Sequence, residues 1–289
     1  MTDFHRGFVF RLSTALLTVA TIPISASIFD LPDGGAGFKL LKIDASPASL
    51  ALSGAGVGSV SEDPVRNPAT DSVGKTTLTA GYGRSFSKMD GSLQQATWAV
   101  PDGRFTWNAI ARFQGFEDIP GRDGDDRSTG TYGASSWALD AGLSSSTSIP
   151  GLRAGATLGA GMNAVSEASA WGAWMSFGVV FQPDSSRWSL GASIRNLGAG
   201  TTSGDHSEQL PLIAQAGATW HQALGNWTLI PMADIKMVAD EELQFPIALE
   251  ARWNILSFRT GYVLGRDEFL PSLGLGLEWD SWLLDAGTA

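Results

Sequence analysis

Residues that commonly perform catalysis are scarce in this chain. It contains no cysteine and three histidines, which are His5, His206 and His221. A serine nucleophile needs a general base within hydrogen-bonding reach, and no motif pairs one of these histidines with such a serine. The absence of cysteine excludes disulfides, thiolate metal sites and cysteine nucleophiles. We therefore expect no catalytic residue, no cofactor and no enzymatic activity.

The most acidic stretch carries the oxygen ligands that calcium prefers. Its carboxylates belong to Glu117, Asp118, Asp123, Asp125 and Asp126. Their spacing does not match the calcium loop of an EF-hand. The pattern therefore favours a solvated loop over a calcium site, and we predict no metal site.

Other charged residues recur at alternate positions within apolar stretches. In one stretch Ile247, Leu249 and Ala251 alternate with Glu250 and Arg252. A period of two indicates a strand with one apolar and one polar face. The charges expected on the polar face, which faces the lumen if the strands form a barrel, are Arg195, Asp234, Lys236, Glu250, Arg252, Arg259 and Glu278, with Arg104, Arg112, Asp140 and Arg153. Because their signs are mixed, we favour paired networks that hold the wall or seat a plug over a polar path for solute.

The same period predicts thirteen strands after residue 73. The expected strands are 74–85, 91–100, 103–114, 130–144, 152–164, 169–181, 187–197, 210–220, 226–238, 245–253, 255–264, 272–279 and 282–289. Short turns alternate with longer loops at 115–129, 198–209, 239–244 and 265–271. Three large apolar residues fall in the polar phase as exceptions, Trp98, Trp174 and Ile213. Strands of about ten residues with loops of unequal length are typical of transmembrane barrels.

Composition and the N-terminus indicate an exported protein. Charged residues make up 17% of the chain, below the about 25% that is usual for soluble domains. The net charge of −10 argues against nucleic acid as a partner. Residues 1–27 have the pattern of a signal peptide, with Arg6 and Arg11 before an apolar stretch and small residues after it. A membrane anchor is the alternative, but the apolar stretch is short for a span.

Three motifs carry a family resemblance. ASPASLALSGAGVGSVSEDP at 45–64 leads into Asn67, Pro68 and Ala69, SLGASIRNLG stands at 189–198 before QLP, and the tail runs from 256 to 287. On these motifs the chain resembles the PorV/PorQ family of outer-membrane proteins, relatives of the FadL-type fatty-acid channels. The resemblance implies that 28–73 is an N-terminal plug segment and that Asn67, Pro68 and Ala69 lie in the barrel mouth. A plain surface turn is the alternative for these three residues.

We therefore expect an all-β protein of the cell outer membrane, a transmembrane antiparallel β-barrel over 74–289 with a plug. Bacterial barrels normally have an even number of strands, and the related barrels have fourteen. We accordingly expect the last strand to be missing from this sequence.

Three functions are compatible with these expectations. The first is a PorV/PorQ-like scaffold without enzymatic activity, associated with protein secretion or surface attachment of the type IX kind. Its partners would be outer-membrane lipid and secretion-system proteins or exported cargo. The second is a FadL-like passive channel for a hydrophobic small molecule. The third, a soluble secreted β-sandwich or adhesin, is the most distant.

Overall fold

The computed structural model describes residues 37–59, 63–70, 75–85, 91–166, 168–203, 206–207, 209–264, 271–279 and 282–288. The predicted signal peptide at 1–27 lies outside the described residues. The same holds for residues 28–36, 60–62 and 71–73 of the predicted plug segment. Within the described part of the chain, no helix is both long and apolar enough to cross a membrane.

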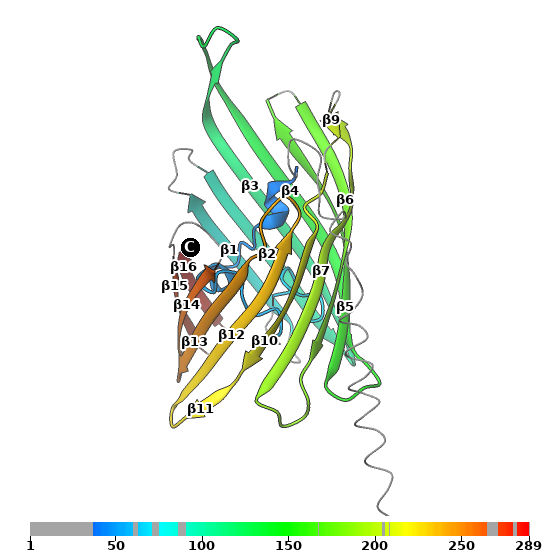
Figure 1. The fold of residues 1–289 in the computed structure, drawn as a ribbon, viewed down its shortest axis with the longest axis vertical. Coiled ribbons are helices and arrows are strands. Elements are labelled where there is room, and N and C mark those ends of the chain that lie inside the picture. The colour runs from blue at the N-terminus through cyan, green and yellow to red at the C-terminus, as the bar shows by residue number, and fades with distance from the viewer. Residues whose placement is uncertain are drawn as a thin grey trace, which may run out of the picture.

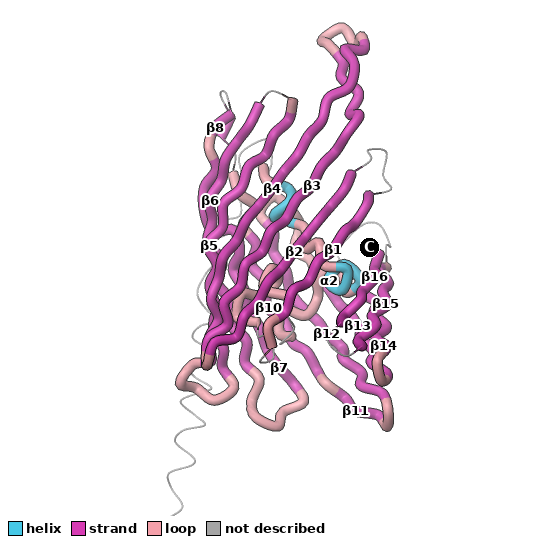
Figure 2. The backbone as a smooth tube through the Cα atoms, turned by 180° about the vertical axis from the view of Figure 1, so that it is seen from behind, coloured by secondary structure: helices cyan, strands magenta, loops and turns pink. Residues whose placement is uncertain are grey.

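The wall of the molecule is one antiparallel sheet of fourteen strands that curls into a barrel-like shape (Figures 1 and 2). All but β11 form a continuous path, and β11 is a short strand beside β12. The path is β1 (Thr77–Ser85), β2 (Gly91–Asp102), β3 (Phe105–Arg122), β4 (Ser128–Ser146), β5 (Leu152–Val165), β6 (Ala168–Phe181), β7 (Trp188–Gly200), β10 (Ile213–Trp220), β12 (Trp227–Val238), β13 (Phe245–Trp253), β14 (Leu256–Leu264), β15 (Ser272–Trp279) and β16 (Trp282–Thr288). Each strand expected from the period of two is present. Hydrogen bonds do not close the sheet, since β1 and β16 end the path.

Strands β3 and β4 extend far beyond the others as a two-stranded ribbon (Figure 1). They contain 18 and 19 residues, so the loop expected at 115–129 was wrong over most of its length. The extension lacks apolar alternation because both of its faces are exposed, and backbone pairing alone marks it as strand. Part of the loop expected at 198–209 also pairs, as β8 (Thr202–Ser203) and β9 (His206–Ser207).

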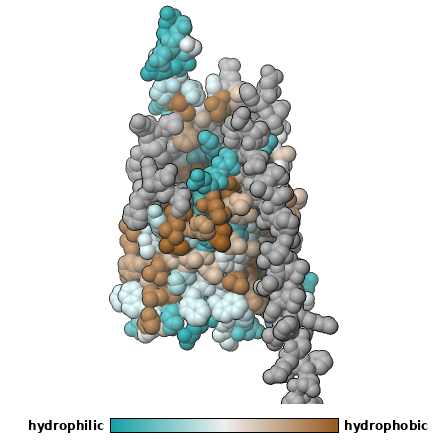
Figure 3. Space-filling model, viewed as in Figure 1, coloured by the Kyte–Doolittle hydropathy of each residue, from teal (hydrophilic) through white to brown (hydrophobic). Residues whose placement is uncertain are grey.

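The outer face of the sheet is apolar and exposed. Leu158, Phe177, Ile235 and Leu275 all point outward with large exposed fractions. Figure 3 shows apolar residues gathered on the lower part of one side and a hydrophilic tip on the β3–β4 ribbon. Trp98, expected in the polar phase, also lies on this face with 53% of its surface exposed. The prediction for Trp98 was therefore wrong, because β2 has too few charges to reveal its phase.

An irregular stretch lies against the inner face of the sheet. We call residues 37–59 and 63–70 the inner segment. It contains η2 (Lys39–Lys42) and α2 (Pro47–Ala51). The Ser46 hydroxyl caps α2 by accepting a hydrogen bond from the Ser49 amide, and Pro47 begins it, a position where proline loses no helical hydrogen bond. Two small apolar clusters join the inner segment to the wall, one around Phe38, Leu40, Leu41, Ala138, Ala170, Trp174 and Leu210, the other around Leu52, Ala55, Ile230 and Met232.

Candidate functional site on the inner face

Polar side chains of the wall bind the backbone of the inner segment. The Asp234 carboxylate of β12 accepts hydrogen bonds from the amides of Gly56 at 2.8 Å and Val57 at 2.9 Å. Gln215 of β10 donates to the same carboxylate and to the Gly54 carbonyl. A buried chain without regular secondary structure needs such partners for its amides and carbonyls. Asp234 and Gln215 therefore fix this turn of the inner segment.

The same kind of bond recurs around the wall. Side chains donate to carbonyls of the inner segment in the pairs Arg195–Val65 (3.1 Å), Asn196–Leu41 (3.3 Å), Ser272–Ala51 (2.8 Å) and Ser144–Thr70 (2.8 Å). These partners come from β7, β15 and β4, which lie at separate positions in the strand order of the sheet. The inner segment is consequently bonded along most of its described length.

The three residues of the predicted plug motif are buried. Asn67 donates to the Val57 carbonyl at 2.8 Å and to the Val179 carbonyl of β6 at 3.1 Å, while its side-chain oxygen accepts from the Ala69 amide. Pro68 and Ala69 are fully enclosed. Asn67 thus joins two parts of the inner segment to the wall, and a surface turn does not describe these residues.

Inward-facing glycines make room for the inner segment. A Cβ atom placed on Gly155 of β5 would lie under 3 Å from the Pro68 carbonyl, and one on Gly178 of β6 would collide with Asn67. Similar collisions with the inner segment would occur at Gly191, Gly261, Gly274 and Gly287. We call these six residues the glycine belt. It lets the two backbones approach closely.

Two networks pair the inward-facing charges. In the first, Arg112 donates to Asp140 at 3.0 Å, and Trp174, predicted in the polar phase, donates to the same carboxylate at 2.6 Å. In the second, Glu250 accepts from Arg259 at 3.0 Å. Arg252 also donates to Glu250, and Arg259 to Asp285.

The predicted lumen charges separate into three groups by burial. Arg195, Asp234, Glu250 and Arg259 are buried on the inner face, as are Arg112 and Asp140. Lys236 and Arg153 are half-buried, whereas Arg104, Arg252 and Glu278 are exposed. The exposed members stand near strand ends, where the inner segment no longer covers the wall.

An ionisable cluster lies within the inner segment itself. The Ser49 hydroxyl donates to Asp63 at 2.9 Å, and the Arg66 guanidinium lies 3.7 Å from the carboxylates of both Asp44 and Asp63. Burial, followed by the nearby charge of Asp44, raises the pKa of Asp63 to about 7. Sequence reasoning missed this cluster, although its members lie within 23 positions of one another.

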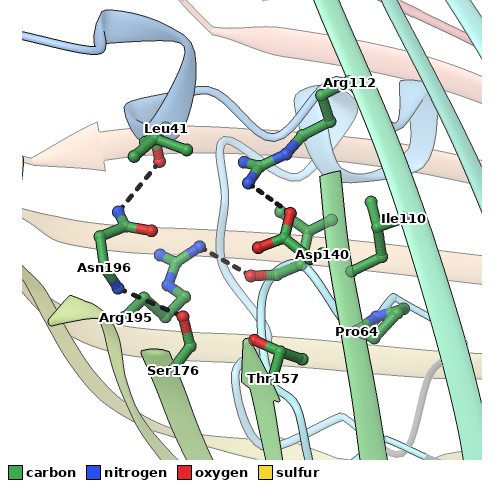
Figure 4. A pocket seen from close by; sticks show the side chains of 10 residues that line it. Leu41, Pro64, Ile110, Arg112, Asp140, Thr157, Ser176, Arg195 and Asn196 are labelled. Atoms are coloured by element: carbon green, nitrogen blue, oxygen red, sulfur yellow. Dashed lines mark hydrogen bonds and ion pairs between the residues drawn. The ribbon is translucent and has the colours of Figure 1, made fainter. Parts of the chain in front are cut away.

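One small cavity lies between the inner segment and the wall. Its volume is about 10 Å³, room for about one water molecule. Polar residues contribute to its lining, among them Arg112, Asp140, Arg195 and Asn196 (Figure 4). A separate apolar groove of about 210 Å³ lies between Trp188, Trp220 and Pro231, and it shares no lining residue with the cavity.

The other residues considered for chemistry do not form a site. Among the described residues no group of histidines and carboxylates could hold a metal ion. In the acidic ribbon Asp123 accepts hydrogen bonds from the backbone of its own turn, and Arg122 pairs with Asp126 at 3.0 Å. The side chain of His206 lies outside the described residues, and His221 stands between β10 and β11 (Gln222–Leu224).

Comparison with known proteins adds no relative. No protein-family model matches the chain, and no curated protein matches it significantly.

Proposed function

We propose that this chain is an outer-membrane β-barrel protein. The proposal is supported by an outer face on which aliphatic and aromatic side chains stay exposed, because in water such a surface would be covered. Among the described residues no second sheet covers that face, which leaves a soluble sandwich with the least support. The proposal predicts recovery in the outer-membrane fraction after carbonate washing. Release into the soluble fraction would contradict it.

We further propose that the inner segment is a plug and that the protein is a PorV/PorQ-like scaffold without enzymatic activity. One observation carries this proposal: wall side chains bond the inner segment from several sides and leave a cavity for about one water. An interior segment held in this way suits a protein that presents surfaces to partners. The partners implied by the resemblance are secretion-system proteins or exported cargo.

The β3–β4 ribbon is the surface that we assign to those partners. It projects beyond the apolar zone and carries exposed charges of both signs, among them Arg122, Asp125 and Arg127. The experiment compares proteins that co-purify with the detergent-solubilised chain and with a variant in which 117–127 is replaced by a short turn. Loss of specific partners from the shortened variant at equal membrane yield supports the assignment. Identical partner sets would contradict it.

The alternative of a FadL-like channel for hydrophobic compounds has less support. Such a channel needs an apolar compartment inside the wall, whereas the cavity found beside the inner segment is small and is lined in part by Arg112, Asp140 and Arg195. Uptake of a fluorescent fatty acid by vesicles that contain the protein tests it. Uptake above that of protein-free vesicles would favour the channel.

A further inference from the structure

The apolar groove of about 210 Å³ lies on the outer face of the wall, at the end opposite the β3–β4 ribbon (Figure 1). Its lining residues are Trp188, Ala218, Thr219, Trp220, Pro231, Met232 and Ala233. Those with exposed side chains belong to the outward phase of β10 and β12. The groove is therefore accessible from outside the wall.

The groove exists because two small side chains stand side by side on adjacent strands. Ala218 of β10 pairs with Ala233 of β12. On one side Ala218 pairs with Leu190 of β7, and on the other Ala233 pairs with Ile247 of β13. Paired residues of antiparallel strands project from the same face. The leucine and the isoleucine thus rise above the two alanines between them and leave a narrow apolar channel, which fits a hydrocarbon chain.

Two tryptophans stand at the end of the groove nearest the short turns. Trp188 and Trp220 are paired residues of β7 and β10. The ring of Phe181 meets the Trp188 ring edge to face, with the centroids 5.8 Å apart, and so fixes its position. Tryptophan rings favour the headgroup level of a membrane. In a membrane the groove would run from this level toward the hydrocarbon.

An arginine lies just beyond the tryptophans. Arg187 directly precedes Trp188, and its carbonyl accepts a hydrogen bond from the His221 amide at 2.6 Å. Its exposed guanidinium donates to the side-chain oxygen of Gln222 at 3.2 Å. Gln222 follows Trp220 by two positions in the same outward phase. The guanidinium is therefore held beside the headgroup end of the groove.

The charge of Arg187 has no counter-ion among the described residues, because the acceptor that it binds is a neutral amide. Arg252 differs, although it also is exposed and stands at the same end of the wall. Its guanidinium pairs with the carboxylate of Glu250 at 3.1 Å. An apolar groove with an uncompensated cation at one end is complementary to an anionic amphiphile.

We infer that the groove and Arg187 form a binding site for one anionic phospholipid of the surrounding membrane. The phosphate group would meet Arg187, and one acyl chain would lie over Ala218 and Ala233 beside the tryptophan rings. Arginine near a membrane surface attracts anionic lipid, and the groove supplies a fixed place for the chain. The inference rests on the membrane placement proposed above. It adds that this part of the outer face selects its lipid.

Native mass spectrometry of the detergent-folded protein tests the headgroup end. The probes are phosphatidylglycerol and phosphatidylcholine with identical acyl chains, and wild type should retain one phosphatidylglycerol more tightly. Arg187→Gln should weaken phosphatidylglycerol binding about fivefold, the contribution of one arginine at an anionic membrane surface. Arg187→Lys keeps the charge and should keep the preference. Arg104→Gln is the matched control, since Arg104 is exposed at the same end but stands over the Phe105 ring, outside the groove.

A second pair of variants tests the acyl end and does not depend on the arginine. Ala218→Phe fills the groove and should weaken the binding of both lipids. Ala216→Phe is its control, because Ala216 is exposed two positions earlier on β10 and does not line the groove. Both variants add the same apolar side chain to the outer face, so a difference between them reports on the groove.

Four outcomes would overturn the inference. Equal retention of the two lipids by wild type would mean unselective lipid contact. Equal losses in Arg187→Gln and Arg104→Gln would mean a general effect of charge. Equal binding by Ala218→Phe and Ala216→Phe would place the lipid elsewhere. A dimer that Ala218→Phe abolishes would assign the groove to a second copy of the chain.

Fractionation of carbonate-washed membranes separates this inference from the proposed location. A chain that stays in the outer membrane without lipid selectivity contradicts the lipid site alone. Release of the chain into the soluble fraction would contradict both.

Discussion

On the outer face of β13, Leu249 is exposed beside other apolar side chains, whereas on the inner face of β12, Asp234 is buried and accepts three hydrogen bonds. The outer position needs only an apolar side chain, and several types would serve. The inner position needs one carboxylate at one place. The two faces therefore differ in how narrowly they restrict the side chain at each position, so substitutions on them should fail for different reasons.

The largest effect is expected for Asp234→Ala on the inner face. The change leaves the amides of Gly56 and Val57 buried without an acceptor, at about 1–3 kcal/mol each. We expect the inner segment to become sensitive to protease while the wall stays folded. Asp234→Asn is the control, because its amide oxygen still accepts. Protection equal to wild type for the alanine variant would contradict the role of Asp234.

On the outer face Leu249→Arg should reduce membrane assembly, since a cation in mid-membrane costs about 2–4 kcal/mol on a barrel. The control is Leu224→Arg at the exposed end of β11, where the cost falls to about 0–1 kcal/mol. The yield of folded protein in outer membranes measures both. Equal yields would contradict the membrane placement.

At the neighbouring position, Ala248, the sequence pattern and the structure predict different effects of a substitution. The alternation alone predicts that Ala248→Arg on the inner face is better tolerated than Leu249→Arg, provided that the lumen has room. Ala248 instead packs against the cluster of Leu52, Ile230 and Met232. We therefore expect Ala248→Arg to loosen the inner segment, and limited proteolysis distinguishes this defect from failed assembly.

A smaller effect is expected in the glycine belt. Gly155→Ala places a Cβ against the Pro68 carbonyl, and overpacking of this kind costs about 1–3 kcal/mol. Gly83→Ala is the matched control, because that inward-facing position has no atom closer than 3.9 Å to the new Cβ. The midpoint of denaturant unfolding should fall for the first variant only. Equal midpoints would mean that the inner segment shifts without cost.

The smallest effect concerns pH. The pKa of Asp63 is raised to about 7, above its value of about 3.9 in an unfolded chain. Between these values the folded state binds the extra proton, so stability falls as pH rises from about 3.9 to about 7 and is constant above it. Across one pH unit the change is at most about 1.4 kcal/mol. Asp63→Asn should abolish the pH dependence of the unfolding midpoint. A pH profile that is unchanged in this variant would show that another group causes the dependence.

The period of two was sufficient to locate the strands, because each strand places unlike side chains on its two faces. It failed on the β3–β4 ribbon, where both faces are exposed and the residue pattern carries no signal. Trp98 was misplaced for a related reason, since β2 has no charged residue before Asp102.

The inner site was only partly predictable. The buried charges Asp234, Glu250 and Arg259 follow from the alternation, and Asn67 from the family resemblance. The partners of Asp234 and Asn67 do not follow, because most are backbone groups of the inner segment outside η2 and α2. A sign of the glycine belt was nevertheless present, as glycine recurs in the inward phase of successive strands such as β5, β6 and β7.

The inner segment precedes every strand of the wall, and this order has a consequence for assembly. Ser53 and Ser272 share a hydrogen bond across 219 positions of sequence. Contacts so remote must wait until nearly the whole chain is available, and proteins rich in them fold slowly. A segment synthesised first therefore stays without its last partners until the final hairpin arrives. Factors that shield it during that interval would change the rate and yield of maturation, but not the finished protein.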